Sequence, residues 1–564
     1  MKKIMISICA AILLIILGIS LYYIIKDKPS EQINTPDTII TPTVAPDPTT
    51  TPAVTSAPLP KEESLLYPAY QVLDGLTKYG YIDSTGSFVI KPVYDYADDF
   101  SDGLAVVRQG EDNLIIDRTG AVIYKSKNTI GSFHNGAASI LTTEEVWLYG
   151  FIDTAGNIIV EPKYSSVSNF DKNGHAYAYL PDTSTYDLID ITGNVVESYK
   201  PNIDADYVSS FEDGYGVYTK RGKQGVISIA TGKTILEPNF SSISYLGNNL
   251  FAVKDPSVEG YEAELMPVAI FNLEGEQLTD YVYYEVSHFN GDYASACDDT
   301  TIFFIGTDGK PVNSLPSFDG SGVLTLIDNV IKANVDGVLT YYHTDNTVLW
   351  KPETFIKLSP EITVRDMIFK PLRTVLVHYP QVEGLADTNV QNRINEQLET
   401  NFIEPRANIT KEDTLTVSDS FVASLHNSLL IISMSGYDYY AGAAHGMPLQ
   451  NYYFIDISTG EFYELKDLFR KDSDYKTPIN EFISKEINDD IATGESMFFE
   501  DQFKSISDAQ YFYLTEGGLT IYFYPYDIAA YAGGFPEFTM TYDQLEDVLD
   551  KEGSFWKAYM GTAE

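Results

Sequence analysis

The sequence predicts a mainly β protein with an N-terminal membrane helix, a β-repeat array, and a C-terminal α+β domain with an antiparallel sheet. Three observations predict this class. Residues 4–25 form an uncharged apolar run, a glycine turn recurs every 34 to 43 residues, and composition and period both change after Trp350-Lys351-Pro352. The expected divisions are a membrane anchor at 1–28, a Pro/Thr-rich linker at 29–63, the repeat array at 64–355 and the α+β domain at 360–560.

The first segment, MKKIMISICAAILLIILGISLYYIIKDK, predicts a membrane helix. Ile4 to Ile25 carries no charge, and its 22 residues can cross about 30 Å of hydrocarbon as a helix. The run ends in large residues, Leu21 to Ile25, whereas a cleavage site needs small ones, so an uncleaved anchor is favoured over a cleaved signal peptide. Lys2 and Lys3 favour an N-terminus inside the cell. We therefore expect a single-pass protein of the cell membrane with most of the chain extracytoplasmic.

Composition restricts the class of partner. The segment from Pro29 to Pro60 holds eight prolines and eight threonines, which favours an extended spacer over a folded core. The chain has 80 acidic and 37 basic residues, a formal charge of -43. Such a surface repels nucleic acid and anionic lipid and attracts a cationic partner. The two cysteines, Cys9 and Cys297, offer no disulfide framework in the exported part.

Internal repeats predict the array. YGYIDSTGSFVIKPVYDYADDFSDGLAVV, from Tyr79, aligns with YGFIDTAGNIIVEPKYSSVSNFDKNGHAYAY, from Tyr149. Each unit alternates apolar residues, turns at D-x-x-G and later turns at F-x-x-G, which predicts three or four short antiparallel strands. Seven or eight such units must stack to bury their apolar faces, so a β-propeller is favoured and a β-solenoid is the alternative. The hairpin positions are Gly86, Gly120, Gly156, Gly193, Gly232, Gly275, Gly309 and Asn346.

These units resemble the WG (or KWG) repeats of bacterial surface proteins. The residues of the first unit that carry the resemblance are Tyr79-Gly80, Ile82-Asp83, Gly86, Pro92, Tyr94, Phe100, Gly103 and Ala105. Tryptophan is absent from the first pair, and later units depart further, as at Gln224-Gly225. The resemblance implies an architecture and no chemistry. The acidic stretch DYADDFSDG, residues 95–103, lacks calcium-loop spacing and is interpreted as a tight turn.

The region after residue 360 mixes strand and helix patterns. Helical spacing of apolar residues predicts a helix over 388–402, and two more helices are expected at 476–491 and 542–549. Strands are expected at 374–379, 421–425, 429–434, 451–457 and 518–524. Together they predict an α+β domain with an antiparallel sheet.

This region resembles the extracytoplasmic domain shared by RsiV-type anti-sigma factors and certain peptidoglycan deacetylases. The resemblance rests on YPQVEGLADTNVQNRIN, on YDYYAGAAHGMPLQNYYFIDISTGEFYELKDLF, and on FYLTEGGLTIYFYPYDIAAYAGGFPEFTMTYDQLEDVL. Only Met1, Lys2 and Lys3 precede the apolar run, so we do not expect a cytoplasmic sigma-binding segment. The deacetylases carry their metal ligands in a separate domain, so deacetylase activity is not carried over. What the resemblance implies is a lysozyme-receiving domain, and the acidity of the chain suits such a cationic partner.

The stretch GYDYYAGAAHG, residues 436–446, holds the candidate partner-binding residues Tyr437, Tyr439, Tyr440 and His445. It is interpreted as a loop between strands. A structural role for His445 is favoured over partner contact, and partner contact over catalysis, because no second ligand or base lies at a readable spacing.

No motif of a known enzyme class occurs. The sequence lacks H-E-x-x-H, G-x-S-x-G, a Walker loop and a dinucleotide fingerprint, so no catalytic or metal residue is assigned and no cofactor is expected. We expect a membrane-anchored binding protein of the cell envelope that recognises wall polysaccharide or a cationic wall-active protein such as a lysozyme. The alternatives are a carbohydrate- or peptidoglycan-binding scaffold and a wall-modifying enzyme. No nucleic-acid partner is expected.

Overall fold

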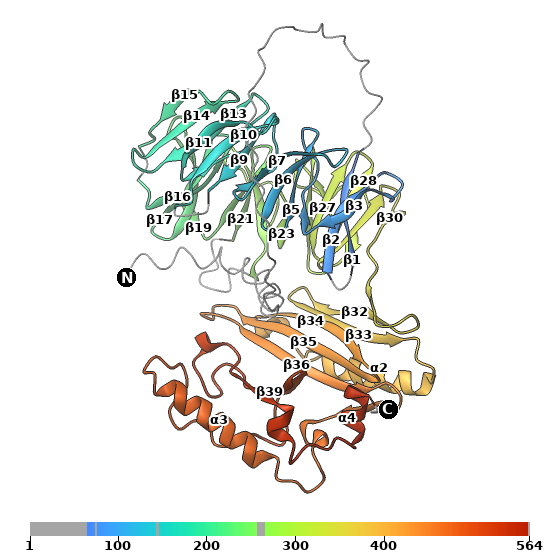
Figure 1. Ribbon diagram of the computed structural model, residues 1–564. Coiled ribbons are helices and arrows are strands. Elements are labelled where there is room, and N and C mark those ends of the chain that lie inside the picture. The colour runs from blue at the N-terminus through green and yellow to red at the C-terminus, as the bar shows by residue number, and fades with distance from the viewer. Residues whose placement is uncertain (1–64, 74–75, 143–145, 203, 256–264, 562–564) are drawn as a thin grey trace, which may run out of the picture. The chain divides into compact units, whose positions relative to one another are not determined.

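The computed structural model describes residues 65–73, 76–142, 146–202, 204–255 and 265–561 (Figure 1). The predicted membrane helix and linker lie outside these residues. Among the described residues, no helix combines the length and the apolar character needed to cross a membrane. The prediction of a mainly β chain with antiparallel sheets is confirmed.

The repeat array, residues 65–350, consists of eight small antiparallel sheets that follow one another along the chain (blue to yellow in Figure 1). The first four sheets contain β1 (Tyr67–Leu73), β2 (Leu76–Ile82) and β3 (Phe88–Tyr94); β4 (Tyr96–Ala97), β5 (Leu104–Gln109), β6 (Asp112–Asp117) and β7 (Val122–Ser126); β8 (Thr129–Ile130), β9 (Ala137–Leu141), β10 (Tyr149–Asp153) and β11 (Ile158–Tyr164); β12 (Ser166–Val167), β13 (His175–Leu180), β14 (Thr185–Asp190) and β15 (Val195–Tyr199). The last four contain β16 (Tyr207–Glu212), β17 (Tyr215–Lys220), β18 (Lys223–Ser228) and β19 (Thr234–Phe240); β20 (Ile243–Gly247), β21 (Leu250–Lys254) and β22 (Val268–Asn272); β23 (Glu285–Val286), β24 (Tyr293–Cys297), β25 (Thr301–Gly306) and β26 (Phe318–Asp319); β27 (Gly322–Ile327), β28 (Val330–Val335), β29 (Val338–His343) and β30 (Val348–Trp350).

The predicted hairpin positions all adopt the left-handed conformation. The seven glycines have φ between 68° and 85°, and Asn346, at the eighth place, has φ 69°. Only glycine and, to a lesser degree, asparagine or aspartate adopt this conformation at small cost, so the eighth turn keeps the geometry without glycine. The preceding aspartates complete the turns, as where Asp83 Oδ1 accepts hydrogen bonds from the Thr85 and Ser87 N–H groups at 2.8 and 3.2 Å.

The glycine of the Y-G pair has a different role. A Cβ at Gly150 would lie 2.2 Å from the Val160 carbonyl oxygen. Tyr149 pairs with Tyr164 and Phe151 with Val160, so Gly150 alone opposes the three residues of a bulge centred on Pro162. Proline is tolerated at such a bulge because no ladder hydrogen bond is needed there. The Y-G and I-x-P-x-Y segments of the repeat are therefore two sides of one close backbone contact.

Gly150→Ala is expected to lower the free energy of unfolding by about 1–3 kcal/mol, because the new methyl group must displace backbone. Gly517→Ala is the matched control, since a Cβ there meets no atom within 4 Å. Urea denaturation of the full chain compares the two variants. Equal effects of both substitutions would contradict the close-contact explanation.

Turns of the F-x-x-G type hold successive sheets together. Asp102 lies at φ 53°, and its carboxylate accepts a hydrogen bond from the Gly136 N–H of the next sheet at 2.7 Å. Similar side-chain bonds to the following unit are Asn135 to the Phe170 carbonyl at 2.8 Å, Asn248 to the Gly291 carbonyl at 2.7 Å and Asn290 to the Leu326 carbonyl at 3.0 Å. The acidic stretch at 95–103 thus contains a tight turn, as the sequence predicts, and the structure adds that this turn bonds to the next sheet.

The last sheet of the array contacts the first. The Tyr341 hydroxyl donates to the Pro68 carbonyl at 2.7 Å, and its ring centroid lies 5.4 Å from that of Tyr67. Both tyrosines are buried, together with Ile82 and Val330. Two ends of the array that are far apart in sequence therefore share one core.

The C-terminal part, residues 355–561, is built on a seven-stranded sheet in sequence order (yellow to orange in Figure 1). Its strands are β31 (Phe355–Lys357), β32 (Thr363–Leu372), β33 (Val375–Glu383), β34 (Leu415–His426), β35 (Leu429–Tyr440), β36 (Met447–Asp456) and β37 (Glu461–Tyr463). The remaining elements are α2 (Thr388–Ile403), η2 (Lys411–Asp413), η3 (Leu465–Leu468), α3 (Lys476–Ile491), a small sheet of β38 (Phe512–Thr515), β39 (Gly518–Tyr522) and β40 (Glu537–Thr541), η4 (Tyr531–Gly533), η5 (Tyr542–Leu545) and α4 (Ser554–Met560).

Strand β35 of the seven-stranded sheet contributes to a core on each face of the sheet. Leu430 and Ile432 of β35 pack in one core with the apolar stripe of α2, whereas Leu429 belongs to a second core with α3 and β39. This alternation follows from the two-residue period of a strand. The sheet is antiparallel except for β33 and β34, which pair in parallel because α2 crosses between them.

Two predicted elements are corrected. The helix expected at 542–549 is reduced to the short 3-10 helix η5. The residues after it instead bond with the segment 468–470, because the Arg470 N–H donates to the Val548 carbonyl at 2.8 Å and the Asp550 N–H to the Leu468 carbonyl at 3.0 Å. The stretch 436–446 is a loop only from residue 441, since residues 436–440 pair within the β34–β35–β36 sheet.

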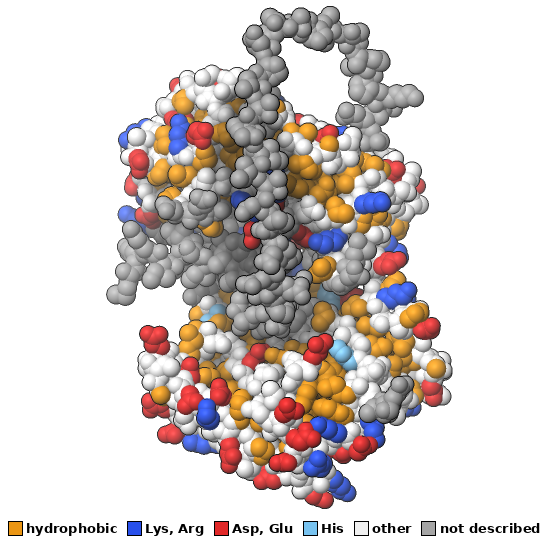
Figure 2. Space-filling view, in the orientation of Figure 1, with side chains coloured by type: hydrophobic (Ala, Val, Ile, Leu, Met, Phe, Trp, Pro, Cys, Tyr) orange, Lys and Arg blue, Asp and Glu red, His pale blue; other side chains and the backbone are white. Residues whose placement is uncertain are grey.

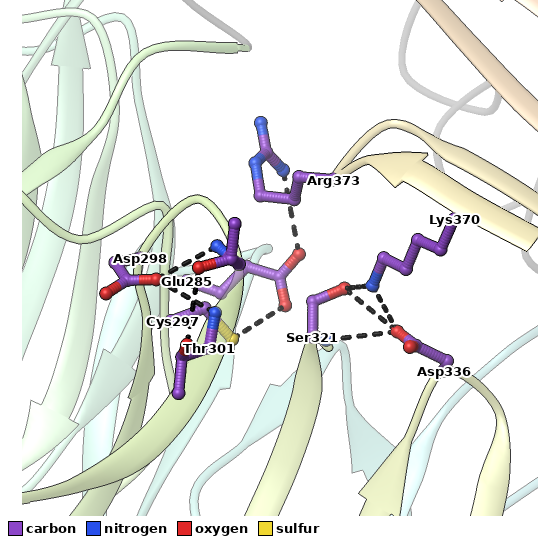
Figure 3. Close-up of polar contacts among 9 residues, drawn as sticks. Glu285, Cys297, Asp298, Thr301, Ser321, Asp336, Lys370 and Arg373 are labelled. Carbon is purple, nitrogen blue, oxygen red and sulfur yellow. Dashed lines mark hydrogen bonds and ion pairs between the residues drawn. The ribbon is translucent and has the colours of Figure 1, made fainter. Parts of the chain in front are cut away.

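Basic side chains of the C-terminal part contact acidic residues of the array (Figure 3). Lys370 forms an ion pair with Asp336 and donates to the Ser321 hydroxyl at 2.8 Å. Arg373 lies 4.0 Å from a carboxylate oxygen of Glu285, with its guanidinium 4.3 Å from the ring centroid of Tyr284. Few cations are available in this acidic chain, so their placement here indicates a defined contact between these strands and the last two sheets of the array.

A titratable pair lies beside this contact. The Asp366 carboxylate, 2.9 Å from Nδ1 of His378, raises the pKa of that histidine, and Asp336 acts in the same direction. Because the pKa of His378 in the folded chain exceeds the unfolded value of about 6.5, the protonated histidine stabilises the fold. This contribution is complete below about pH 6.5, and it is lost as the pH rises through the folded-state pKa.

Asp366→Asn should therefore reduce the fall in Tm of the full chain between about pH 6 and pH 9, because the variant has little of this stabilisation to lose. Differential scanning calorimetry at several pH values measures the difference. An unchanged pH dependence in the variant would show that His378 does not titrate in this way.

Candidate functional site: aromatic clusters beside strand β36

The structure separates the four predicted partner-binding residues. Tyr437, Tyr439 and Tyr440 lie on β35, and His445 lies in the loop before β36. The Tyr437 hydroxyl accepts a hydrogen bond from the Gly446 N–H at 2.9 Å and so joins the histidine loop. The Tyr439 hydroxyl donates a long hydrogen bond to the Ala443 carbonyl, at 3.4 Å, and Tyr440 is 55% exposed.

His445 is held by two segments. Nδ1 lies 3.0 Å from the Gly446 carbonyl oxygen, and Nε2 lies 3.0 Å from the Tyr526 hydroxyl. Its ring stacks on Tyr531, with centroids 3.6 Å apart at an interplanar angle of 23°. We call Tyr437, His445, Tyr526 and Tyr531 the histidine cluster.

The hydrogen bonds decide what His445 can do chemically. A carbonyl oxygen only accepts, so Nδ1 carries the proton that it donates to Gly446. In the neutral ring Nε2 then accepts from the Tyr526 hydroxyl. Both nitrogens are engaged, and the ring face contacts another aromatic ring. The arrangement orients the imidazole as a rigid part of a surface.

Tyr526 and Tyr531 were not predicted, because they follow His445 by 81 and 86 residues. Their sequence signal is the tyrosine-rich stretch YFYPYDIAAYAGG, which has no helical or strand period. Tyr526 has φ 75°, an unusual conformation for a bulky residue, and is 51% exposed. Tyr531 donates to the Gly446 carbonyl at 2.9 Å, and burial, with Tyr437 as a second cause, raises its pKa to about 12.

A buried ion network fixes the strand that carries Tyr437. Arg406 donates to both carboxylate oxygens of Asp419, on β34, and to both of Asp438, on β35, at 2.8 to 3.1 Å. The Asp419 side chain is fully buried. Burial raises the pKa of Asp419, and the guanidinium opposes that change. The network ties the turn that follows α2 to strands β34 and β35.

A second group of aromatic side chains lies beside β36. Tyr522 and Tyr524 both donate to the Gln450 carbonyl, at 2.9 and 2.8 Å. Tyr511 stacks on Tyr522 with centroids 5.5 Å apart, and Tyr452 lies 5.1 Å from Tyr513. Burial raises the pKa of Tyr524 to about 12. We call Tyr452, Tyr511, Tyr513, Tyr522 and Tyr524 the tyrosine cluster.

The site offers ring faces rather than metal ligands. In the part of the chain that the structure describes, no group of three or more histidine, cysteine, aspartate or glutamate side chains is placed to hold a metal ion. On the face shown in Figure 2, carboxylates are scattered rather than gathered in one patch. The features that the described residues bring together are therefore aromatic rings, amides and hydroxyls.

Two protein-family models match the chain. The model described as WG containing repeat matches residues 79–111 and 149–179, and the model described as protein of unknown function (DUF3298) matches residues 466–543. The second match includes Tyr526 and Tyr531, but it begins after His445 and so does not contain that histidine.

The chain is also similar to one curated enzyme and to several solved structures. Peptidoglycan-N-acetylmuramic acid deacetylase PdaC of Bacillus subtilis (strain 168) is 25% identical over 158 residues, which cover 28% of this chain and 33% of the deacetylase. A DUF3298 family member from Bacteroides fragilis is 17% identical, with 36% of this chain and 98% of that one covered at a TM-score of 0.28. One from Pseudomonas aeruginosa is 17% identical, with 35% and 95% covered at 0.26. Hsv2 of Kluyveromyces lactis is 12% identical, with 47% and 90% covered at 0.27.

The match to PdaC spans only about a third of that enzyme, and likenesses at these TM-scores carry no argument about function. The two family models agree with the repeats and with the C-terminal elements described above. The chain therefore carries WG-containing repeats in its first half and a DUF3298 domain in its second half.

Proposed function

We propose that this chain is a membrane-anchored, extracytoplasmic binding protein of the cell envelope that recognises wall material or a wall-active protein such as a lysozyme. The uncharged run at residues 4–25 supplies the anchor, and residues 29–63 supply an extended spacer. The DUF3298 match and the similarity to a peptidoglycan deacetylase support a role at the cell wall. The net charge of -43 favours a cationic protein partner.

In this proposal the array is a closed β-propeller of eight blades that presents the C-terminal part. The hydrogen bond between Tyr341 and the Pro68 carbonyl supports closure, because it joins the last sheet to the first. The ion pairs of Lys370 and Arg373 support a fixed presentation.

The observation that carries the proposal is the histidine cluster. Its hydrogen bonds and stacking hold His445 as part of a rigid aromatic surface, and rigid, half-exposed aromatic residues supply contact area at a small entropic cost. A histidine base is commonly oriented by a carboxylate at its second nitrogen, whereas Nδ1 of His445 bonds to the Gly446 carbonyl. Binding is therefore favoured over wall modification, and a peptidoglycan-binding scaffold is the nearest alternative.

His445→Ala tests this proposal in the full chain purified in detergent. We expect the wild type to co-sediment with purified peptidoglycan sacculi or to bind a lysozyme at low salt. The variant should bind the same partner about tenfold more weakly, because Tyr526 and Tyr531 lose their shared contact. Tyr207→Ala, on the array and outside the cluster, is the matched control, because that ring is 54% exposed. Failure of the wild type to bind either partner would refute the proposal.

A further inference from the structure

We infer that a groove beside the tyrosine cluster is a binding site for an uncharged oligosaccharide. This inference rests on the proposed function and names the chemical class of ligand. The groove has a volume of about 320 Å³ and lies among the C-terminal half of α2, strands β36 and β37, and residues 508–512. That volume is at the lower end of the range of about 300–1,000 Å³ found for small-molecule sites.

Aromatic rings form part of the groove wall. Tyr452 and Tyr511 line it, and Tyr511 is 40% exposed. Tyr511 is held by its stacking on Tyr522 and by Tyr524, whose ring centroid is 5.0 Å away. A fixed and partly exposed ring face suits the C–H face of a pyranose, which is apolar while its edge carries hydroxyls.

Amide groups supply the complementary polar contacts. Gln397 donates to the Asn401 side-chain oxygen at 2.9 Å, which fixes both side chains on α2. The described residues give no partner to Nδ2 of Asn401, to Oε1 of Gln397 or to the Tyr511 hydroxyl. Donors and acceptors at neutral groups match sugar hydroxyls and acetamido groups.

The charges at the groove rim are already paired. Oε2 of Glu464 lies 2.6 Å from Nζ of Lys466, and Oδ1 of Asp508 lies 2.6 Å from Nζ of Lys476. Both carboxylates line the groove, but each has its counter-ion within the same molecule. A cationic protein would gain little there, although the chain as a whole is strongly acidic. The groove therefore favours a neutral ligand over a lysozyme.

Isothermal titration of the full chain in detergent with chitohexaose and with cellohexaose tests this inference. We expect at least one of these uncharged probes to bind, with an affinity that changes less than about twofold between low and high salt because no ion pair is lost. Tyr511→Ala and Asn401→Ala should each weaken binding about tenfold or more. Tyr207→Ala, which removes an exposed tyrosine of the array outside the groove, should bind as the wild type does.

The outcomes separate this inference from the proposed function. Absence of binding to both probes, or unchanged affinity in folded Tyr511→Ala and Asn401→Ala proteins, would overturn the groove assignment. If sacculi or a lysozyme still bind in that case, the proposed function stands and only the groove is wrong. Circular dichroism and Tm verify that each variant is folded, and Asn401→Ala on the surface of α2 keeps the test decisive if Tyr511→Ala unfolds.

Discussion

Arg406→Ala is expected to lower the free energy of unfolding of the C-terminal part by about 3–5 kcal/mol. The guanidinium is bonded to Asp419 and Asp438 at once, and its side chain is 9% exposed. Its removal leaves a fully buried carboxylate, Asp419, without a counter-ion. Burial already raises the pKa of Asp419, so the variant can relieve part of the cost by taking up a proton. The loss should therefore be larger at pH 8 than at pH 5.

Urea denaturation of the full chain, followed by tryptophan fluorescence and circular dichroism, measures this effect. Arg393→Ala is the matched control, because Arg393 is exposed and donates to the carbonyl of the exposed Thr459. We expect the control to change stability by less than about 1 kcal/mol. A loss in Arg406→Ala as small as in the control would mean that the network does not hold β34 and β35 together.

Tyr341→Ala is expected to lower the stability of the array by about 3–5 kcal/mol, because it empties a fully buried aromatic site between the last and first sheets. Tyr341→Phe keeps the ring and removes only the bond to the Pro68 carbonyl, so its cost should be about 1–2 kcal/mol. The difference separates packing from hydrogen bonding in the closure of the array.

The same denaturation experiment applies, with Tyr207→Ala as control because that ring is 54% exposed. An array in which the first and last sheets do not support each other would lose no more stability in Tyr341→Ala than in the control. That result would contradict the proposed closed propeller and leave the open solenoid.

The sequence predicts features whose cause is local. The eight hairpin positions from Gly86 to Asn346 all adopt positive φ because the turn itself requires a residue that tolerates it. Helix α2 follows from apolar residues four apart, and α3 spans the residues expected of it. These signals lie within one turn or one helix, so they can be read without the rest of the fold.

Features set by distant contacts could not be predicted in this way. The segment 542–549 has a helical pattern, yet the residues beyond Leu545 bond with residues 468–470 instead. The histidine cluster needs Tyr526 and Tyr531, which reach His445 only after the fold brings β36 and the segment before β40 together. Of the four predicted site residues, Tyr437 joins His445, and Tyr439 and Tyr440 do not.

The fraction of full-length protein that co-sediments with purified peptidoglycan sacculi, with and without soluble chitohexaose, tests the central claim most directly. We predict that the wild type is retained by the sacculi and released by the soluble sugar. His445→Ala and Tyr511→Ala should be retained less, and Tyr207→Ala, on the array, should be retained as the wild type is. A wild-type chain that stays in the supernatant and also fails to bind a lysozyme would contradict the account of an envelope-binding protein.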